Sequence, residues 1–356
     1  MAINQALRSA LLALGLAAGT AASQAAWALD LTFSIATPGS FTANQIAIIN
    51  TALGQVEQMW ESRLVGYQPG IAIGAVPIGI HATNTGLASA SFASTTFQGG
   101  YTLATSGFVN INTLEIENFA NWQGDEANGL NFIDELLAHE VGHVLGIGTL
   151  WASNGVYQFN TFQYTGAHGV AAYQAEFNHS ILYAPVENAG NAGTPNSHWD
   201  QLMRSSVEGT GGVGDPFLLD PRVGVTDQYG RDRALELMTG AIDPDWREPF
   251  LARFTVQSMR DMGYAVTEFE DFNGDGLINL ADRDLLMSNL GATGLQVNSM
   301  CFGDADRDRD VDVADLRLWE AAAGVPEPGS AALAWAGLAA VAAASRLRGT
   351  RCAKGA

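Results

Sequence analysis

Basic residues are scarce in this chain. Only 17 of its 356 residues are lysine or arginine, against 37 aspartates and glutamates, and the formal net charge is −20. A protein that binds the phosphate backbone needs a basic stripe, so this balance excludes a nucleic-acid binder. Charged residues make up only 15% of the chain and hydrophobic residues 47%. This composition excludes a disordered acidic protein and leaves room for two or three folded domains.

Cysteine is almost absent as well. The two cysteines are Cys301 and Cys352, and the second lies beyond an apolar segment near the C-terminus. An intrachain disulfide is therefore not expected, and two cysteines are too few for a zinc site built from thiolates. A zinc site in this chain must use other donors, and there are only 6 histidines.

Both ends of the chain have the pattern of targeting segments. Residues 1–28 combine Arg8, a short apolar run and small residues up to Ala28, which predicts a signal peptide cleaved after Ala28. Residues 324–356 contain V-P-E-P, an apolar stretch and a basic tail. They resemble the PEP-CTERM sorting signal of Gram-negative bacteria, a simple tail anchor being the alternative. The resemblance implies export across the inner membrane to the cell envelope or beyond, and a membrane-embedded sorting enzyme that removes the tail.

One segment carries a metal-binding pattern. Apolar residues recur at helical spacing through residues 130–146, with Gly146 as a candidate stop. Within it, His139 and His143 are four residues apart, so their imidazoles face the same side of a helix and can bind one zinc ion. Glu140 can act as general base toward a water molecule in the open position of that ion.

A tetrahedral catalytic zinc needs a third protein ligand. Gly146 allows a sharp turn after the helix, so a downstream residue can supply it. The position that holds a histidine in many metzincin peptidases is Thr149 here, and a threonine cannot replace an imidazole. Spacing alone leaves three downstream candidates open: His168, His179 and His198.

The segment 139–151, with the sequence H-E-V-G-H-V-L-G-I-G-T-L-W, resembles the leishmanolysin family of metzincin zinc peptidases. Three later segments are similar to that family's third-histidine region, Met-turn and closing helix: residues 186–199, 236–240 and 254–264. The resemblance implies that His198 is the third zinc ligand and that Met238 packs beneath the histidines. Leishmanolysin-like proteins are commonly rich in cysteine, and in this respect the chain departs from the family.

The sequence before the histidine motif is typical of an α+β fold. Its patterning predicts strands at 29–35, 71–80 and 108–112 and a helix at 42–64. The resemblance implies a metzincin-type peptidase domain over residues 29–267, in which a mixed sheet and the zinc helix precede an irregular subdomain with the Met-turn. In that family an edge strand aligns an extended peptide substrate. The sequence does not identify that strand here.

The negative charge is concentrated in residues 268–323, which hold 13 acidic and 4 basic residues. Two EF-hand-like loops lie there, 33 residues apart, with oxygen donors at positions 1, 3, 5, 9 and 12 and a main-chain carbonyl at position 7. The predicted calcium ligands are Asp271, Asn273, Asp275, Leu277, Asn279 and Asp282, then Asp304, Asp306, Asp308, Asp310, Asp312 and Asp315. Position 6 is glycine in the first loop but Arg309 in the second, where the turn is less easy. An acidic solvated linker is the alternative.

This repeated unit of a loop and a helix resembles a type I dockerin. The resemblance implies a small α-helical, EF-hand-like module over residues 268–323 that docks a cohesin-like partner. Positions 10 and 11 of each loop are Leu280-Ala281 and Val313-Ala314, not the Ser/Thr pairs common in cellulosomal dockerins. A rigid calcium-bound spacer is the other interpretation.

Together these patterns predict an exported zinc-dependent metalloendopeptidase that hydrolyses proteins or peptides, with zinc and calcium as cofactors. One alternative is a calcium-dependent adhesion or scaffold protein with a zinc-binding core that does not cleave peptides. The presence of Glu140 argues against it, since such a core has no need of a base. A second alternative is a metalloenzyme that acts on glycans, which normally requires paired carboxylates that the zinc helix does not supply.

Overall fold

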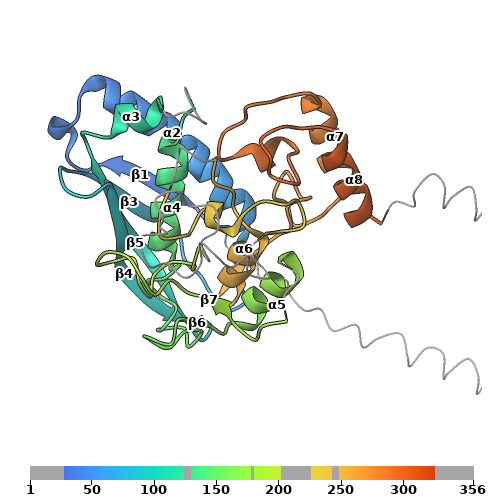
Figure 1. Cartoon of the computed structure of the whole chain (residues 1–356), viewed down its shortest axis with the longest axis horizontal. Helices are drawn as coiled ribbons and strands as arrows, with labels where there is room; N and C mark the ends of the chain where they lie inside the picture. Colours follow the sequence, from blue (N-terminus) through green and yellow to red (C-terminus); the bar gives the residue numbers. More distant parts are fainter. Residues whose placement is uncertain (1–27, 124–129, 178–179, 202–225, 243–247, 325–356) are drawn as a thin grey trace, which may run out of the picture.

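The computed structural model describes residues 28–123, 130–177, 180–201, 226–242 and 248–324. Within these residues the chain is a mixed α+β protein with seven α-helices, α2 to α8, and a mixed four-stranded sheet. In Figure 1 the sheet lies on the left, helices α7 and α8 lie on the right, and α6 lies between them. The predicted α+β class is confirmed.

The sheet has the strand order β1-β3-β5-β4. Strand β1 pairs in parallel with β3, and β3 pairs in parallel with β5, whereas β4 runs antiparallel to β5 and forms one edge. The strands span Leu31–Ile35 (β1), Val76–Thr83 (β3), Ala88–Gln98 (β4) and Tyr101–Asn112 (β5). Alternating apolar residues of β3 and β5 are buried, so these central strands supply the core face of the sheet.

Two long helices pack together beside the sheet. Helix α2 begins after Thr42, whose side chain forms a capping box with Gln45. Trp60 of α2 donates a hydrogen bond to Ala138 O in α4, so the helix with the two histidines is fixed against α2. The helices in this part of the chain are Ala43–Arg63 (α2), Ile116–Ala120 (α3) and Ile133–Leu145 (α4).

After α4 the described chain has little regular structure. Helices α5 and α6 pack against each other, and short strands form two two-stranded ribbons, β2 with β8 and β6 with β7. The bounds are Gly66–Tyr67 (β2), Gln163–Tyr164 (β6), Ala167–Glu176 (α5), Ala184–Pro185 (β7), Arg253–Arg260 (α6) and Tyr264–Ala265 (β8). Short 3-10 helices span Pro38–Ser40, Arg233–Leu235 and Ser299–Phe302.

The C-terminal segment, residues 268–324, contains α7 (Leu280–Asn289) and α8 (Val313–Ala322). A small apolar cluster of its own joins the two loop regions to these helices: Phe272, Leu286, Ala305, Val311 and Trp319. Both helices begin with a capping box, formed by position 9 and position 12 of the preceding loop. The helix predicted after each acidic loop is therefore present.

The structure differs from the expected local structure at several points. Strand β3 begins at Val76 rather than at residue 71, strand β5 begins at Tyr101 rather than at residue 108, and the edge strand β4 has no counterpart in the sequence prediction. His168, expected in a loop, lies in the first turn of α5. The predicted signal peptide, except Ala28, and the sorting segment, except Gly324, lie outside the described residues, as does His179. None of the described helices is long and apolar enough to cross a membrane.

Candidate metal centre

Three histidines from distant parts of the chain meet at one point. His139 and His143 lie one turn apart on α4, and His198 lies in the irregular segment after β7. The Nε2 atoms of His139 and His143 are 3.1 Å apart, and that of His198 lies 3.2 Å from the first and 3.0 Å from the second. All three side chains are buried. The helical pair is thus joined by the histidine that the family resemblance implies.

The second ring nitrogen fixes the orientation of each histidine. Each Nδ1 lies at hydrogen-bond distance from a backbone carbonyl oxygen: His139 from Leu237 (2.7 Å), His143 from Ile147 (2.9 Å) and His198 from Thr194 (2.9 Å). Because a carbonyl oxygen only accepts, each Nδ1 carries the proton. Each Nε2 then presents a lone pair to the other two, which is the arrangement of histidines that bind a metal ion.

These residues fit a metal ion. Three lone pairs about 3 Å apart repel one another unless a cation lies among them. A tetrahedral ion with bonds of about 2.05 Å holds its nitrogen ligands about 3.3 Å apart, close to the observed spacing. Burial lowers the pKa of all three imidazoles, that of His139 to about 3, so they stay neutral as ligands must. The chain therefore has a three-histidine site that can hold a metal.

Glu140 faces the same cavity as the histidines. Its side chain is buried, and its Oε2 atom has no hydrogen-bond partner among the described residues. Burial raises the pKa of this carboxyl to about 8, and a cation nearby would lower it again. An unpartnered carboxylate oxygen beside the histidines is free to accept a proton from a water molecule.

The turn after α4 brings the third histidine to the site. Gly146 ends the helix with a φ of 122°, in keeping with its predicted role as a stop, and Gly148 follows with a φ of 73°. A Cβ atom on Gly148 would lie only 2.0 Å from the carbonyl oxygen of Ser197. Only glycine therefore lets the chain pass this close to the residue before His198.

Met238 packs against the helix that carries two of the histidines. It is fully buried, and a Cβ atom on Gly142, which lies between the two histidines of α4, would be 2.7 Å from its sulfur. Its carbonyl oxygen accepts a hydrogen bond from the Trp199 main chain. The Met238 turn therefore touches both the helix and the segment of the third histidine.

A buried carboxylate holds this turn in place. Glu236 accepts hydrogen bonds from Met238 N (2.7 Å), Ala252 N (3.2 Å) and the Thr255 hydroxyl (2.6 Å). Burial raises its pKa to about 7. Through this contact Glu236 fixes the residues on either side of Leu237, whose carbonyl oxygen orients His139. In the sequence, Glu236 is distinguished only as the first residue of the Met-turn motif, because nothing in the local pattern marks its role.

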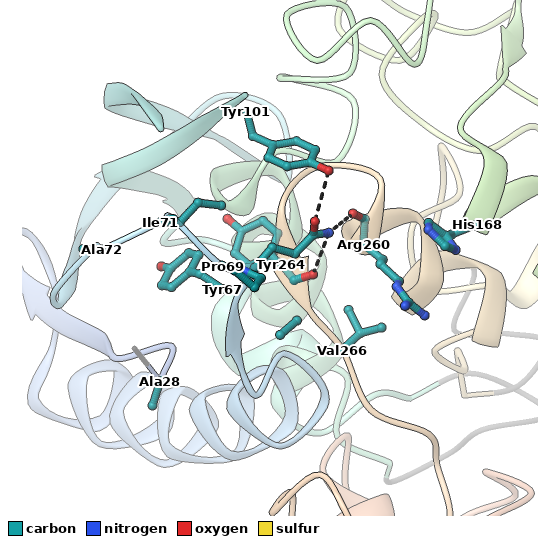
Figure 2. Close-up of a pocket in the computed structure, with 13 residues that line it drawn as sticks. Ala28, Tyr67, Pro69, Ile71, Ala72, Tyr101, His168, Arg260, Tyr264 and Val266 are labelled. Carbon is teal, nitrogen blue, oxygen red and sulfur yellow. Dashed lines mark hydrogen bonds between the residues drawn. The ribbon is translucent and has the colours of Figure 1, made fainter. Parts of the chain in front are cut away.

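The metal centre opens into a cavity of about 420 Å³. Leu87 and the start of the edge strand β4, residues 88–90, form one wall, and residues 192–194, 197–198 and 239–242 form others. A larger cavity of about 1250 Å³ lies elsewhere, between Tyr67, Tyr101 and Arg260 (Figure 2). It contains none of the predicted ligands, and His168, an alternative third ligand, lines that cavity instead. Chemistry rather than size identifies the smaller cavity as the candidate site.

The two acidic loops share one hydrogen-bond pattern. In the first loop the carboxylate at position 1, Asp271, accepts from the main chain at positions 5 and 6, and Asp282 at position 12 accepts from positions 2, 3 and 9. In the second loop, Asp304 and Asp315 accept from the same positions. The loops therefore have matching backbone folds, although position 6 is glycine in only one of them.

Acidic side chains of the second loop converge. Two groups have carboxylate oxygens within 4.8 Å of one another: Asp304, Asp306 and Asp315, and then Asp310, Asp312 and Asp315. Burial, followed by repulsion from neighbouring aspartates, raises the pKa of Asp306 to about 7. Among the described residues the Oδ1 atoms of Asp306 and Asp310 have no hydrogen-bond partner. These features fit a cation held by oxygen ligands.

The remaining predicted loop ligands lie at the loop surface or at helix starts. In the first loop, Asn273 and Asp275 are exposed, and Asn279 caps α7. Leu277 offers its carbonyl oxygen, which accepts from the Asn279 side chain. Asp308 is exposed and belongs to neither convergent group.

A scan against protein-family models and a search of curated proteins find no match for this chain. The resemblances to leishmanolysin, to dockerins and to the sorting signal therefore rest on the quoted motifs.

Proposed function

We propose that this protein is a zinc-dependent metalloendopeptidase of the leishmanolysin type. The observation that carries the proposal is the convergence of three Nε2 lone pairs beside the unpartnered Glu140 carboxylate. Three neutral imidazoles with one open position are typical of catalytic zinc sites. A binding protein has no need of a base there, so Glu140 favours hydrolysis over adhesion.

The residues have separate roles in the proposed reaction. His139, His143 and His198 hold the metal, and the carbonyl oxygens that accept from their Nδ1 atoms keep the rings oriented. Zinc, when bound, activates a water molecule and stabilises the negative charge that develops on the scissile carbonyl oxygen. Glu140 takes the proton from that water at Oε2 and delivers it to the leaving amine.

The edge of the sheet supports a peptide as substrate. Leu87 and the first residues of β4, 88–90, line the cavity of the metal centre, and within the described residues β4 has a neighbouring strand on one side only. An extended peptide can pair with the free edge of such a strand through main-chain hydrogen bonds. This placement makes β4 the strand that would align the scissile bond beside Glu140.

We further propose that the C-terminal segment binds calcium in both loops, as dockerin-like modules do. The shared carboxylate-to-backbone pattern and the unpartnered oxygens of Asp306 and Asp310 support this assignment. Docking to a cohesin-like partner, export from a Gram-negative cell and removal of the C-terminal tail by a sorting enzyme remain proposals that follow from the quoted motifs.

The decisive experiment measures casein cleavage by the purified chain. We expect activity that a zinc chelator abolishes, that zinc restores, and that Glu140→Gln lowers by at least about 100-fold, the contribution typical of a general base. Glu320→Gln on α8 is the control and keeps full activity. Equal cleavage by the wild type, the chelated protein and Glu140→Gln would rule out the proposed reaction. Zinc binding without cleavage would favour the adhesion alternative.

A further inference from the structure

The second acidic loop contains two arginines where the first has glycines. Arg307 and Arg309 occupy positions 4 and 6 with φ values of 66° and 72°, and the matching Gly274 and Gly276 have 68° and 84°. A left-handed conformation costs a residue with a Cβ atom about 1 kcal/mol. Two such residues in one loop indicate that their side chains make contacts that offset this strain.

Arg309 reaches the helix of the metal centre. Its guanidinium forms an ion pair of 2.8 Å with Glu135, and it also donates to Pro249 O. Both side chains of the pair are at least nine-tenths buried. Glu135 lies on α4 one turn before His139, so this contact fixes the helix directly beneath a metal-binding histidine.

Arg307 reaches the same histidine by a second route. It pairs with Glu176 at 2.9 Å in a buried contact and donates to Leu251 O. Phe250 lies between Pro249 and Leu251, whose carbonyl oxygens accept from the two arginines. Its main chain donates a hydrogen bond to Leu235 O and accepts one from Leu237 N. The carbonyl oxygen of Leu237 is the group that orients His139. Both arginines are therefore connected, through chains of contacts, to the same ligand of the metal centre, His139.

Asp304, at position 1 of the second loop, fixes the main chain of both arginines. Asp304 accepts from Arg307 N at 2.6 Å and from Arg309 N at 3.0 Å. Its carboxylate belongs to the group that converges with Asp306 and Asp315. Without a cation these carboxylates repel one another, and the backbone that carries the arginines loses its anchor.

We propose that calcium in the second loop positions His139 through Arg309 and Arg307, so that the affinity of the three-histidine site for zinc depends on calcium. The arginines are positioning residues and touch neither metal. The inference rests on the proposed zinc and calcium sites and goes beyond them, because it makes the C-terminal segment part of the metal centre rather than a separate docking module.

The test measures zinc affinity of the intact chain by chelator competition, with and without calcium, beside calcium uptake by calorimetry. We expect calcium to tighten zinc binding at least tenfold in the wild type, the size of effect that outer contacts of a metal site usually have. Calcium should also slow amide hydrogen exchange in α4. Arg317→Gln, an exposed change on α8, is the control and keeps both effects.

Two variants separate coupling from folding. Arg307→Gly with Arg309→Gly gives the second loop the two glycines that the first loop has at the same positions. We therefore expect calcium uptake to persist and the effect of calcium on zinc affinity to disappear. Arg309→Met with Glu135→Leu removes both charges of one ion pair, so that Glu135 is not left as an unpaired buried carboxylate, and it should weaken the effect. Calcium uptake with unchanged zinc affinity in the wild type would overturn the coupling alone. No calcium uptake at all would overturn the proposed calcium sites and the coupling with them.

Discussion

The choice of the third metal ligand gives the sharpest prediction. Spacing in the sequence leaves His168, His179 and His198 open as the third ligand. His179 lies outside the described residues, and the structure separates the other two completely. The Nε2 atom of His198 lies 3.0 Å and 3.2 Å from those of the two helix histidines. His168 is exposed and lines a different cavity. Replacing each by alanine therefore tests the geometry of the centre.

The size of the effect follows from the number of ligands. Structural zinc sites with four protein ligands bind with about 10–16 kcal/mol, so one ligand contributes about 2.5–4 kcal/mol on average. His198→Ala should therefore weaken zinc binding by about 100- to 1000-fold. His168→Ala should change it less than twofold, because that side chain makes no contact with the centre.

The assay is competition for zinc with a chromogenic chelator at fixed calcium and pH 7.5, together with thermal unfolding of each variant without metal. The second measurement shows whether the variant is folded. A His198→Ala protein that is folded and binds zinc as tightly as the wild type would refute the reasoning. So would a tenfold loss in His168→Ala.

Further predictions concern the turns and the buried carboxylate around the centre. Gly148→Ala should destabilise the protein by at least about 2 kcal/mol more than Gly155→Ala in urea unfolding. Both residues have φ near 70°, but only at Gly148 would a Cβ atom meet the backbone, at Ser197; equal losses would contradict this account. Glu236 has a folded pKa of about 7, above its ordinary value, so its stabilising contribution is complete below pH 4.5 and is lost as the pH rises through 7. The stability of Glu236→Gln relative to the wild type should therefore rise by up to about 3 kcal/mol between pH 4.5 and pH 7. A difference that does not change with pH would contradict the assigned pKa.

The local sequence pattern predicted those ligands of the metal centre that are close to each other in the sequence. His139 and His143 share a helical face because they are four residues apart, and the apolar spacing around them defined α4 well. His198 could not be chosen in this way, because its position depends on Gly148 passing against the chain before it. His198 was selected by the motif resemblance, because the local sequence pattern does not report this long-range contact.

Other features left no usable signal in the sequence. Strand β4 is rich in alanine, serine and threonine and lacks clear alternation of buried and exposed residues, so its pairing with β5 decides its structure. Arg309 was noted as unfavourable for a turn, but its partner Glu135 is 174 residues away. Such long-range pairs become visible only when the fold brings the segments together.

The irregular region after α4 shows how this chain holds distant segments together with few cysteines. Buried or partly buried carboxylates there accept hydrogen bonds from the main chain of distant segments. Glu176 accepts from Arg253 N and Phe254 N, and Asp261 accepts from His168 N and Gly169 N.

Each of these carboxylates joins segments roughly 80 or 90 residues apart, which is the task that disulfides perform in cysteine-rich proteins. Hydrogen bonds to charged groups contribute about 1.5–3 kcal/mol each, so two such bonds, about 3–6 kcal/mol, are comparable to the 2–4 kcal/mol of a typical disulfide. Glu176 also forms an ion pair with the buried Arg307 of the second acidic loop. The same carboxylate therefore joins two segments of the irregular region and ties that region to the proposed calcium site.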